Sequence, residues 1–334
     1  ELNADERAVL DWVDTRSDAM IETVKAWSAI NSGSRNPDGL ERMRGCLETA
    51  FGELDDARIE AVELQPSTVV EPDGRVHEQP YTPSFRCSIR PEAPIRIAMT
   101  GHHDTVFPLS STFQSTTLWD EDTLNGPGVA DMKGGILVML HGLLALQRSP
   151  WKDQIGVDVL ISPDEEIGSL GSAPVLAEIG ARADIGMTYE PALADGSLAG
   201  ARKGSGNWSL KLSGRAAHAG REHHLGRNAL AAACAFGLEL DGLNGRREDV
   251  TFNLARIDGG GPPNVVPDNA VVRFNIRVKT DNDRIWVLAE LERLLDMVRI
   301  RDGISAELHG GFTRPPKPMS PANAKVFEWT RAAG

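Results

Sequence analysis

Short apolar stretches that end directly in polar clusters constrain the fold of this chain more than any other feature. Three of them span residues 95–100, 157–162 and 185–188, and each is followed within a residue or two by charged or histidine side chains. Segments with helical spacing of apolar residues lie between them, most clearly from about 134 to 146. Strands that alternate with helices favour an α/β domain, with a mostly parallel sheet and helices on both faces.

The first polar cluster contains His102 and Asp104, at the carboxyl end of a predicted strand, where open α/β sheets bind their ligands. Two residues apart in an extended segment, their side chains leave the same face of the backbone, whereas His103 points the other way. Such a carboxylate can accept one ring N–H and leave the other nitrogen for a metal ion. Taken alone, this short motif is more often a surface loop.

A single aspartate, Asp131, stands between a Gly-Pro-Gly turn at 126–128 and the pair Gly134 and Gly135. Flanking glycines indicate a backbone that takes unusual angles. A carboxylate held there, near the start of a helix, could bridge two cations. Alone, it is more typical of an N-cap for the helix that follows.

Glutamates follow the next two strands, as the adjacent pair Glu165 and Glu166 and as Glu190. Adjacent side chains diverge, so one of the pair could bind a metal ion while the other transfers a proton. Each glutamate by itself is typical of a solvated loop. Together with the earlier clusters, however, they provide nitrogen and oxygen ligands without a thiolate, a set that suits catalytic zinc.

From about residue 203 the pattern changes to strand, helix, two strands, helix and strand. The predicted elements are 208–212, 228–240, 251–257, 271–278, 281–298 and 304–308. This order is that of a ferredoxin-like α+β domain. We therefore predict a separate α+β domain at 203–311, inserted into an α/β domain formed by 1–202 and 312–334.

Composition argues against nucleic-acid and membrane partners and indicates a cellular compartment. The net charge of −13 argues against nucleic-acid binding, which needs clustered Lys and Arg. No apolar run approaches the ~20 residues that span a membrane, so we predict no membrane partner. Three widely spaced cysteines favour a reducing, cytoplasmic compartment. Because the chain begins at Glu1 rather than Met, a secreted or periplasmic location stays open.

Three stretches in combination resemble the M20 zinc metallopeptidases, which include glutamate carboxypeptidase, acetylornithine deacetylase and succinyl-diaminopimelate desuccinylase. They are residues 101–106 (GHHDTV), 126–135 (GPGVADMKGG) and 164–169 (DEEIGS). The resemblance covers nearly the whole chain and is nearest to the glutamate carboxypeptidase branch. It implies two zinc ions per chain and hydrolysis of an amide bond in a small peptide or N-acyl amino acid.

The resemblance also implies a role for each matching residue of the metal site. His102 and Glu190 would hold one zinc ion and Glu166 the other, while Asp131 would bridge the two. In this family the peptide bond after the bridging aspartate is often cis, so we expect a cis bond between Asp131 and Met132.

Further roles follow from the same resemblance. Asp104 would orient the histidine ligand, and Glu165 would be the general base on the attacking water. His218, in a GRAAHAG stretch, would stabilise the oxyanion, reaching the site from the partner subunit in dimeric members. Asn264 would contact the substrate, and Arg277 would pair with a substrate carboxylate. The resemblance also implies that the inserted domain is a lid and dimerisation domain through which a homodimer forms, and that the rest is the catalytic metal-binding domain.

The chain departs from the family pattern at its carboxyl end. A histidine in that part of the family normally completes the second zinc site, and none of the eight histidines here matches it; His141 and His309 are poor substitutes. We expect a truncated chain that holds one zinc ion weakly or none. The main prediction is release of a C-terminal amino acid. The alternatives are an N-acyl amino acid deacylase and a non-catalytic homologue that binds metal or amino acids.

Overall fold

The computed structural model describes residues 2–333, and its internal contacts divide them into two compact units. The first contains the chain up to Ser67 together with Pro80–Ala192, and the second contains Thr68–Gln79 and the chain from Leu193 onward. This grouping differs from the predicted boundaries in three places, the first being that residues 193–202 belong to the second unit. A hairpin before residue 80 and the segment after residue 311 both join the second unit.

The first unit is built on a five-stranded sheet with the order β1-β4-β8-β5-β9. Its strands are β1 (Arg58–Val62), β4 (Ser84–Ile89), β5 (Ile95–His102), β8 (Ile155–Ser162) and β9 (Ile185–Thr188). The predicted α/β class is confirmed, but the sheet is mixed: β5 is parallel to β8 and β9, whereas β4 is antiparallel to β1 and β8. Parallel pairing needs a crossover, usually helical, and no helix lies between Phe51 and β5.

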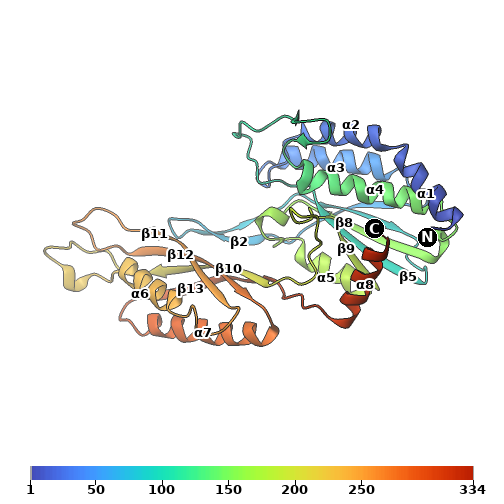
Figure 1. Cartoon of the computed structure of the whole chain (residues 1–334). Helices are drawn as coiled ribbons and strands as arrows, with labels where there is room; N and C mark the ends of the chain where they lie inside the picture. Colours follow the sequence, from blue (N-terminus) through green and yellow to red (C-terminus); the bar gives the residue numbers. More distant parts are fainter. Residues whose placement is uncertain (1, 334) are drawn as a thin grey trace. The chain divides into compact units, whose positions relative to one another are not determined.

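Helices cover both faces of this sheet, as predicted. They are α1 (Ala4–Asp14), α2 (Ser17–Ser28), α3 (Pro37–Phe51), α4 (Gly134–Leu146) and α5 (Ala173–Arg182). Figure 1 shows α1 to α4 on one face and α5 on the other. Successive residues of β8 face opposite ways, since Val159 and Ile161 pack beneath the first group whereas Leu160 packs against Ile179 of α5.

One segment, Val129–Leu146, is long and apolar enough to cross a membrane by length and composition, with a mean hydropathy of 1.5. It contains α4, the central helix of the first core, and 56% of it is buried inside the protein. The core helix of a water-soluble protein has the same properties, so this segment is weak evidence for a membrane span.

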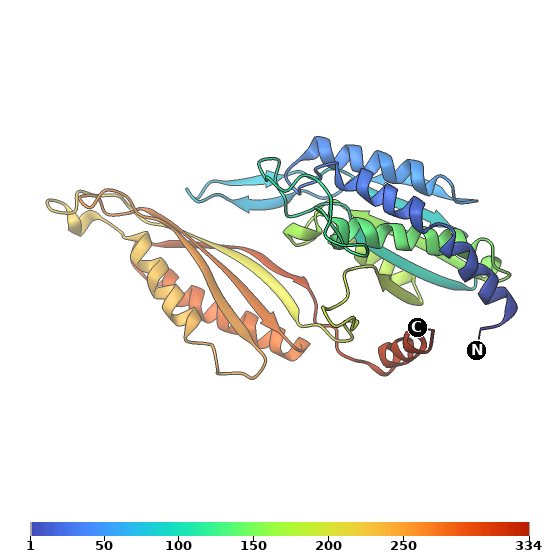
Figure 2. The same ribbon diagram turned by 45° about the horizontal axis from the view of Figure 1, so that its top comes forward.

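The second unit has the predicted ferredoxin-like order of elements. They are β10 (Gly204–Ser213), α6 (Ala229–Asp241), β11 (Thr251–Gly259), β12 (Asn269–Val278), α7 (Asp281–Arg299) and β13 (Ser305–Arg314). The sheet order is β11-β12-β10-β13 and every pairing is antiparallel. In Figure 2 the two helices, coloured yellow-orange and orange, lie side by side on one face of this sheet. A last helix, α8, spans Pro321–Ala333.

A hairpin of β2 (Ser67–Val70) and β3 (Val76–Gln79) joins this unit on the sheet face away from the helices. Arg273 of β12 donates a hydrogen bond of 2.6 Å from Nη2 to the carbonyl oxygen of Val70. Gly74 takes a positive φ of 82° at the hairpin turn, where a Cβ atom would lie 2.2 Å from Oδ1 of Asn269. Contacts between distant parts of the sequence therefore hold the hairpin to the second unit.

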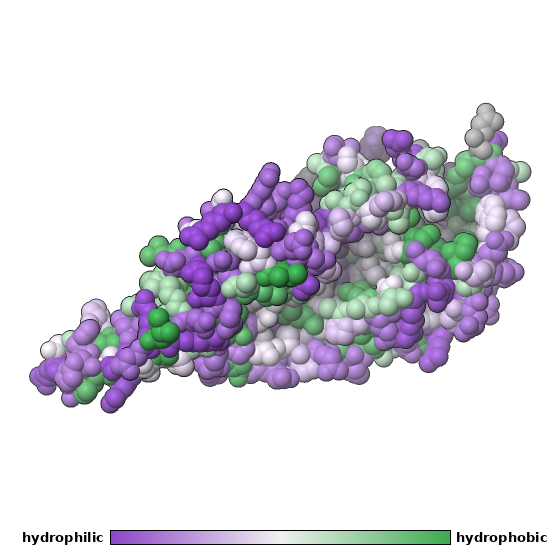
Figure 3. Space-filling model, turned by 90° about the horizontal axis from the view of Figure 1, so that it is seen from below, coloured by the Kyte–Doolittle hydropathy of each residue, from purple (hydrophilic) through white to green (hydrophobic). Residues whose placement is uncertain are grey.

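Hydrophobic and hydrophilic residues are interspersed on the face of the protein shown in Figure 3. Several large apolar side chains of the second unit are exposed on its helices, among them Leu238, Ile285 and Leu288. The three cysteines are unpaired; Cys87 is buried and Cys234 is exposed.

Candidate metal centre

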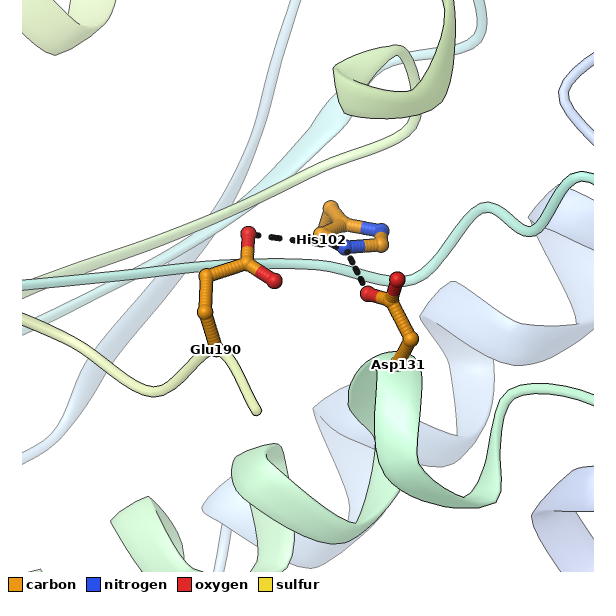
Figure 4. Close-up of side chains that lie close together, drawn as sticks. All are labelled: His102, Asp131 and Glu190. Atoms are coloured by element: carbon orange, nitrogen blue, oxygen red, sulfur yellow. Dashed lines mark hydrogen bonds and ion pairs between the residues drawn. The ribbon is translucent and has the colours of Figure 1, made fainter. Parts of the chain in front are cut away.

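Three side chains that are distant in the sequence meet at one edge of the first sheet. His102 ends β5, Glu190 follows β9, and Asp131 precedes α4. One ligand atom from each lies within 4.8 Å of the other two (Figure 4). Because β5 and β9 are neighbouring parallel strands, their carboxyl ends lie at the same edge, which brings His102 and Glu190 together.

The turn before α4 carries the aspartate to this edge. Gly128 takes a left-handed φ of 68°, and the peptide bond between Asp131 and Met132 is cis, which confirms the expectation from the family resemblance. The Met132 side chain is fully buried, and its sulfur accepts a hydrogen bond of 3.3 Å from the His102 amide. The residue that follows Asp131 is therefore bonded to the backbone of His102, which links the positions of the two side chains.

A second carboxylate, that of the fully buried Asp104, lies beside the Nδ1 atom of the histidine ring and orients the ring. His102 Nδ1 lies 3.0 Å from the Asp104 carbonyl oxygen and 3.3 Å from Oδ1 of the same residue. Both are acceptors, so Nδ1 carries the proton. The unprotonated Nε2 of a neutral ring then faces Oδ1 of Asp131 at 2.9 Å and Oε1 of Glu190 at 3.7 Å.

Nitrogen and carboxylate lone pairs at that distance repel each other unless a positive charge lies between them. Burial of His102 lowers its pKa, but hydrogen bonds to the carboxylates of Asp104, Asp131 and Glu190 outweigh this effect and raise the pKa to about 12. The hydrogen bond from His102 in turn lowers the pKa of Asp131. The site requires a cation at Nε2, supplied either by a proton or by a metal ion, and its donor set fits zinc.

The glutamate pair after β8 is attached to the same buried aspartate. The amide of Glu165 donates to Oδ1 of Asp104 and the amide of Glu166 donates to Oδ2, each at 3.2 Å. Burial, followed by the negative charge of Asp131, raises the pKa of the Glu166 carboxyl to about 7. Glu166 therefore lies near Asp131, although it is outside the three-residue cluster formed by the described residues.

The predicted lid residues all lie in the second unit. The loops of His218 and Asn264 are joined, because the amide of Ala219 donates to the Asn264 carbonyl oxygen at 2.9 Å. Arg277 is exposed near the far end of β12 and donates from Nε to Oδ1 of Asn275 at 3.0 Å. It lies eight residues beyond Asn269, the start of this strand, which is about 26 Å at 3.3 Å per residue. Asn264 lies in the segment that precedes the start of this strand, whereas Arg277 is its next-to-last residue.

Two buried charged residues that support the site are not evident from the sequence. Lys133 donates from Nζ to the carbonyl oxygens of Trp27 and Ile30 at 3.0 and 2.9 Å, and burial lowers its pKa to about 8. It thereby ties the start of α4 to the end of α2. The only sequence signal was a lysine beside the helix start, which looks like an ordinary surface residue.

Asp164 is the second missed residue. It is fully buried, and its Oδ2 accepts hydrogen bonds from the amides of Gly171 and Ser172 at 2.8 and 3.1 Å. These bonds fix the turn that follows Glu165 and Glu166. A position at the head of an acidic run is typical of a solvated residue, and its burial here depends on tertiary packing.

Comparison with known proteins supports the resemblance found in the sequence. Residues 200–300 match the family model described as the M20 peptidase dimerisation domain. Carboxypeptidase G2 of a Pseudomonas species is 27% identical over 275 residues, which cover 82% of this chain and 63% of the relative. A putative succinyl-diaminopimelate desuccinylase of Mycobacterium tuberculosis is 30% identical over 226 residues, covering 64% of this chain and 59% of the relative. The chain thus spans about six tenths of the length of these relatives.

Solved structures of peptidases share the fold. The dipeptidase Dug1p from Saccharomyces cerevisiae has a TM-score of 0.70 at 13% identity, covering 98% of this chain and 83% of its own. A tripeptidase from Staphylococcus aureus has a TM-score of 0.66 at 19% identity, covering 94% and 81%. These similarities show that the chain has the two-unit fold of these peptidases. The dimerisation-domain match and the named relatives, all of them hydrolases, relate the chain to the M20 peptidase family.

Proposed function

We propose that the chain is a zinc-dependent hydrolase that cleaves an amide bond and releases a C-terminal amino acid. The observation that carries the proposal is the convergence of His102, Asp131 and Glu190 on a point that requires a cation. The similarity to carboxypeptidase G2 supports the choice of substrate class. When bound, zinc supplies polarisation of the scissile carbonyl and a lowered pKa for the attacking water.

The residues of the chain divide the remaining work. His102 and Glu190 would hold one zinc ion, Asp131 would bridge to a second, and Glu166 would complete the carboxylate set. Two zinc ions carry four positive charges, so an anionic donor set of this size keeps the site close to neutral.

Glu165 would accept a proton from the attacking water and later pass it to the leaving amine. Its backbone amide is held by Asp104, the same group that orients the histidine ligand. One buried carboxylate therefore sets the positions of a metal ligand and of the general base together. This coupling favours a catalytic centre over a structural metal site, which needs no base.

The second unit would supply substrate contacts. In this proposal His218 stabilises the oxyanion, Asn264 contacts the substrate, and Arg277 pairs with its carboxylate, with different subunits of a homodimer contributing. The match to a dimerisation domain and the exposed apolar residues of α6 and α7 support a dimer formed through this unit. The cytoplasmic location stays a prediction.

The proposal is tested with Glu165→Gln in the full-length protein. We expect zinc content to stay at the wild-type level while turnover falls by about 100- to 10,000-fold, because the variant loses the general base but keeps the ligands. Glu121→Gln, in an exposed loop, is the matched control and should leave turnover unchanged. Retained turnover in Glu165→Gln would exclude this residue as the base, and absence of bound zinc in the wild-type protein would contradict the proposal as a whole.

Deacylation of an N-acyl amino acid is the second candidate, favoured by the similarity to succinyl-diaminopimelate desuccinylases. A panel that sets N-acyl amino acids against dipeptides with C-terminal Glu, Asp or aromatic residues separates the two activities. Bound zinc without turnover of any member of the panel would favour a non-catalytic binding protein.

A further inference from the structure

His218 is exposed, yet two backbone hydrogen bonds hold its ring. Its Nδ1 accepts from the amide of Gly220 at 3.1 Å and from the amide of Arg221 at 3.2 Å. A backbone amide can only donate, so Nδ1 must present a lone pair to both. A neutral ring then carries its single proton on Nε2.

The turn that provides these amides is fixed on both sides of the histidine. The amide of Val266 donates to the carbonyl oxygen of Ala217, and the amide of Ala219 donates to that of Asn264, both at 2.9 Å. The amide of Glu222 closes the turn by donating to the His218 carbonyl oxygen, also at 2.9 Å. Ring and backbone are therefore held together, whereas an exposed histidine ordinarily rotates.

The other ring nitrogen is left available. No hydrogen bond joins Nε2 of His218 to any residue within 2–333. With Nδ1 occupied, this nitrogen is the only one that can meet a ligand, and in the neutral ring it meets that ligand as an N–H donor. The same arrangement argues against His218 as a general base or as a metal ligand, since both roles need a free lone pair.

We propose that the amides of Gly220 and Arg221 are positioning groups that hold His218 as an Nε2–H donor directed at the substrate. Its use on an oxyanion rests on the function proposed above, whereas the protonation pattern of the ring does not. The donor is therefore present before substrate binds, and no tautomer change precedes its use. Loss of one orienting bond should lower kcat and leave KM nearly unchanged, because the donor matters most when negative charge develops.

The protonation pattern can be measured without any substrate. In the 15N-histidine-labelled chain, well above the ordinary histidine pKa of about 6.5, we expect long-range proton–nitrogen spectra to show His218 with Nε2 protonated and Nδ1 unprotonated. Scalar couplings across the hydrogen bonds should link Nδ1 to the amide nitrogens of residues 220 and 221. His218→Gln assigns the signals by removing them. A protonated Nδ1, or a mixture of tautomers without these couplings, overturns the proposal.

A matched pair of variants tests the positioning role. Gly220→Pro removes one donating N–H. Gly220→Ala keeps it, and its Cβ would meet the ring of His218 only at ordinary contact distances of 3.5 and 3.7 Å. We expect the proline variant to lose one coupling, to gain a Nδ1–H population and to lower kcat about 2- to 10-fold, while the alanine variant keeps the wild-type spectrum.

Identical spectra for the two variants would refute the positioning role. Should the proline variant fail to fold, the wild-type couplings decide the matter alone. Because the spectra need no turnover, a wrong assignment of the enzyme's activity and a wrong assignment of His218 give different results.

Discussion

Replacing Asp104 by Asn tests the central claim about the metal centre, that one buried carboxylate holds both the histidine ligand and the glutamate pair. The carboxylate accepts from the amides of Glu165 and Glu166 at 3.2 Å and from the Ser34 hydroxyl at 2.7 Å, and it faces Nδ1 of His102. Asparagine has nearly the same shape, so packing is preserved while one acceptor oxygen becomes a donor.

The expected cost follows from the geometry. In either orientation of the new amide, its NH₂ group faces one of the two glutamate N–H groups, so that one buried donor loses its acceptor. A hydrogen bond to a charged group contributes about 1.5–3 kcal/mol, and breaking a buried charged network costs about 3–5 kcal/mol. We therefore expect the free energy of unfolding to fall by about 3–5 kcal/mol. Zinc affinity should fall about 10- to 100-fold, because the ring of His102 loses the negative charge that faces its Nδ1–H and keeps only the neutral carbonyl oxygen of residue 104.

Denaturant unfolding with a chelator present measures the first quantity, and competition with a chromogenic zinc chelator measures the second. Ser34→Ala is the control, since it removes one hydroxyl donor and leaves both amide bonds, for an expected loss of about 1 kcal/mol. An Asp104→Asn variant with wild-type stability and zinc affinity would refute the reasoning.

Two further predictions concern the core of the first unit. Gly135→Ala should destabilise the chain by about 1–3 kcal/mol, because its Cβ would lie 2.1 Å from the carbonyl oxygen of Tyr189. The Cβ of Gly142→Ala, on the same helix, meets no atom within 4 Å, and this variant should raise the free energy of unfolding by about 0.5–1 kcal/mol. Equal shifts of the two variants in thermal unfolding would contradict the packing argument. Burial raises the pKa of the Cys87 thiol to about 12. The stability contributed by the buried, protonated thiol is therefore complete below the ordinary thiol pKa of about 8.5 and is lost as the pH rises towards 12. A thiol reagent at neutral pH should label exposed Cys234 at once and Cys87 only on unfolding, and rapid labelling of Cys87 in the native chain would count against this burial.

Local patterns in the sequence determined the elements and much of the candidate site. Apolar stretches that end in polar residues predicted β5, β8 and β9, and the order of elements after residue 203 predicted the ferredoxin-like unit. Since neighbouring parallel strands end at the same edge, the sequence also indicated that His102 and Glu190 would meet. These inferences hold because burial imposes a repeat of two residues on strands and about 3.6 on helices, and such repeats are readable within a single segment.

Tertiary structure alone decided which distant groups became partners. Several features leave no periodic signal in their own segments. They are the antiparallel pairing of β1 and β4, the hairpin bound by Arg273, and the burial of Lys133 and Asp164. The acceptors of a buried charge cannot be read from its own segment either. One acceptor of Lys133 is the carbonyl oxygen of Trp27, 106 residues away. A hydrogen bond between two distant segments forms only when the packing of the whole core brings those segments together. The residues of either segment alone do not determine that packing.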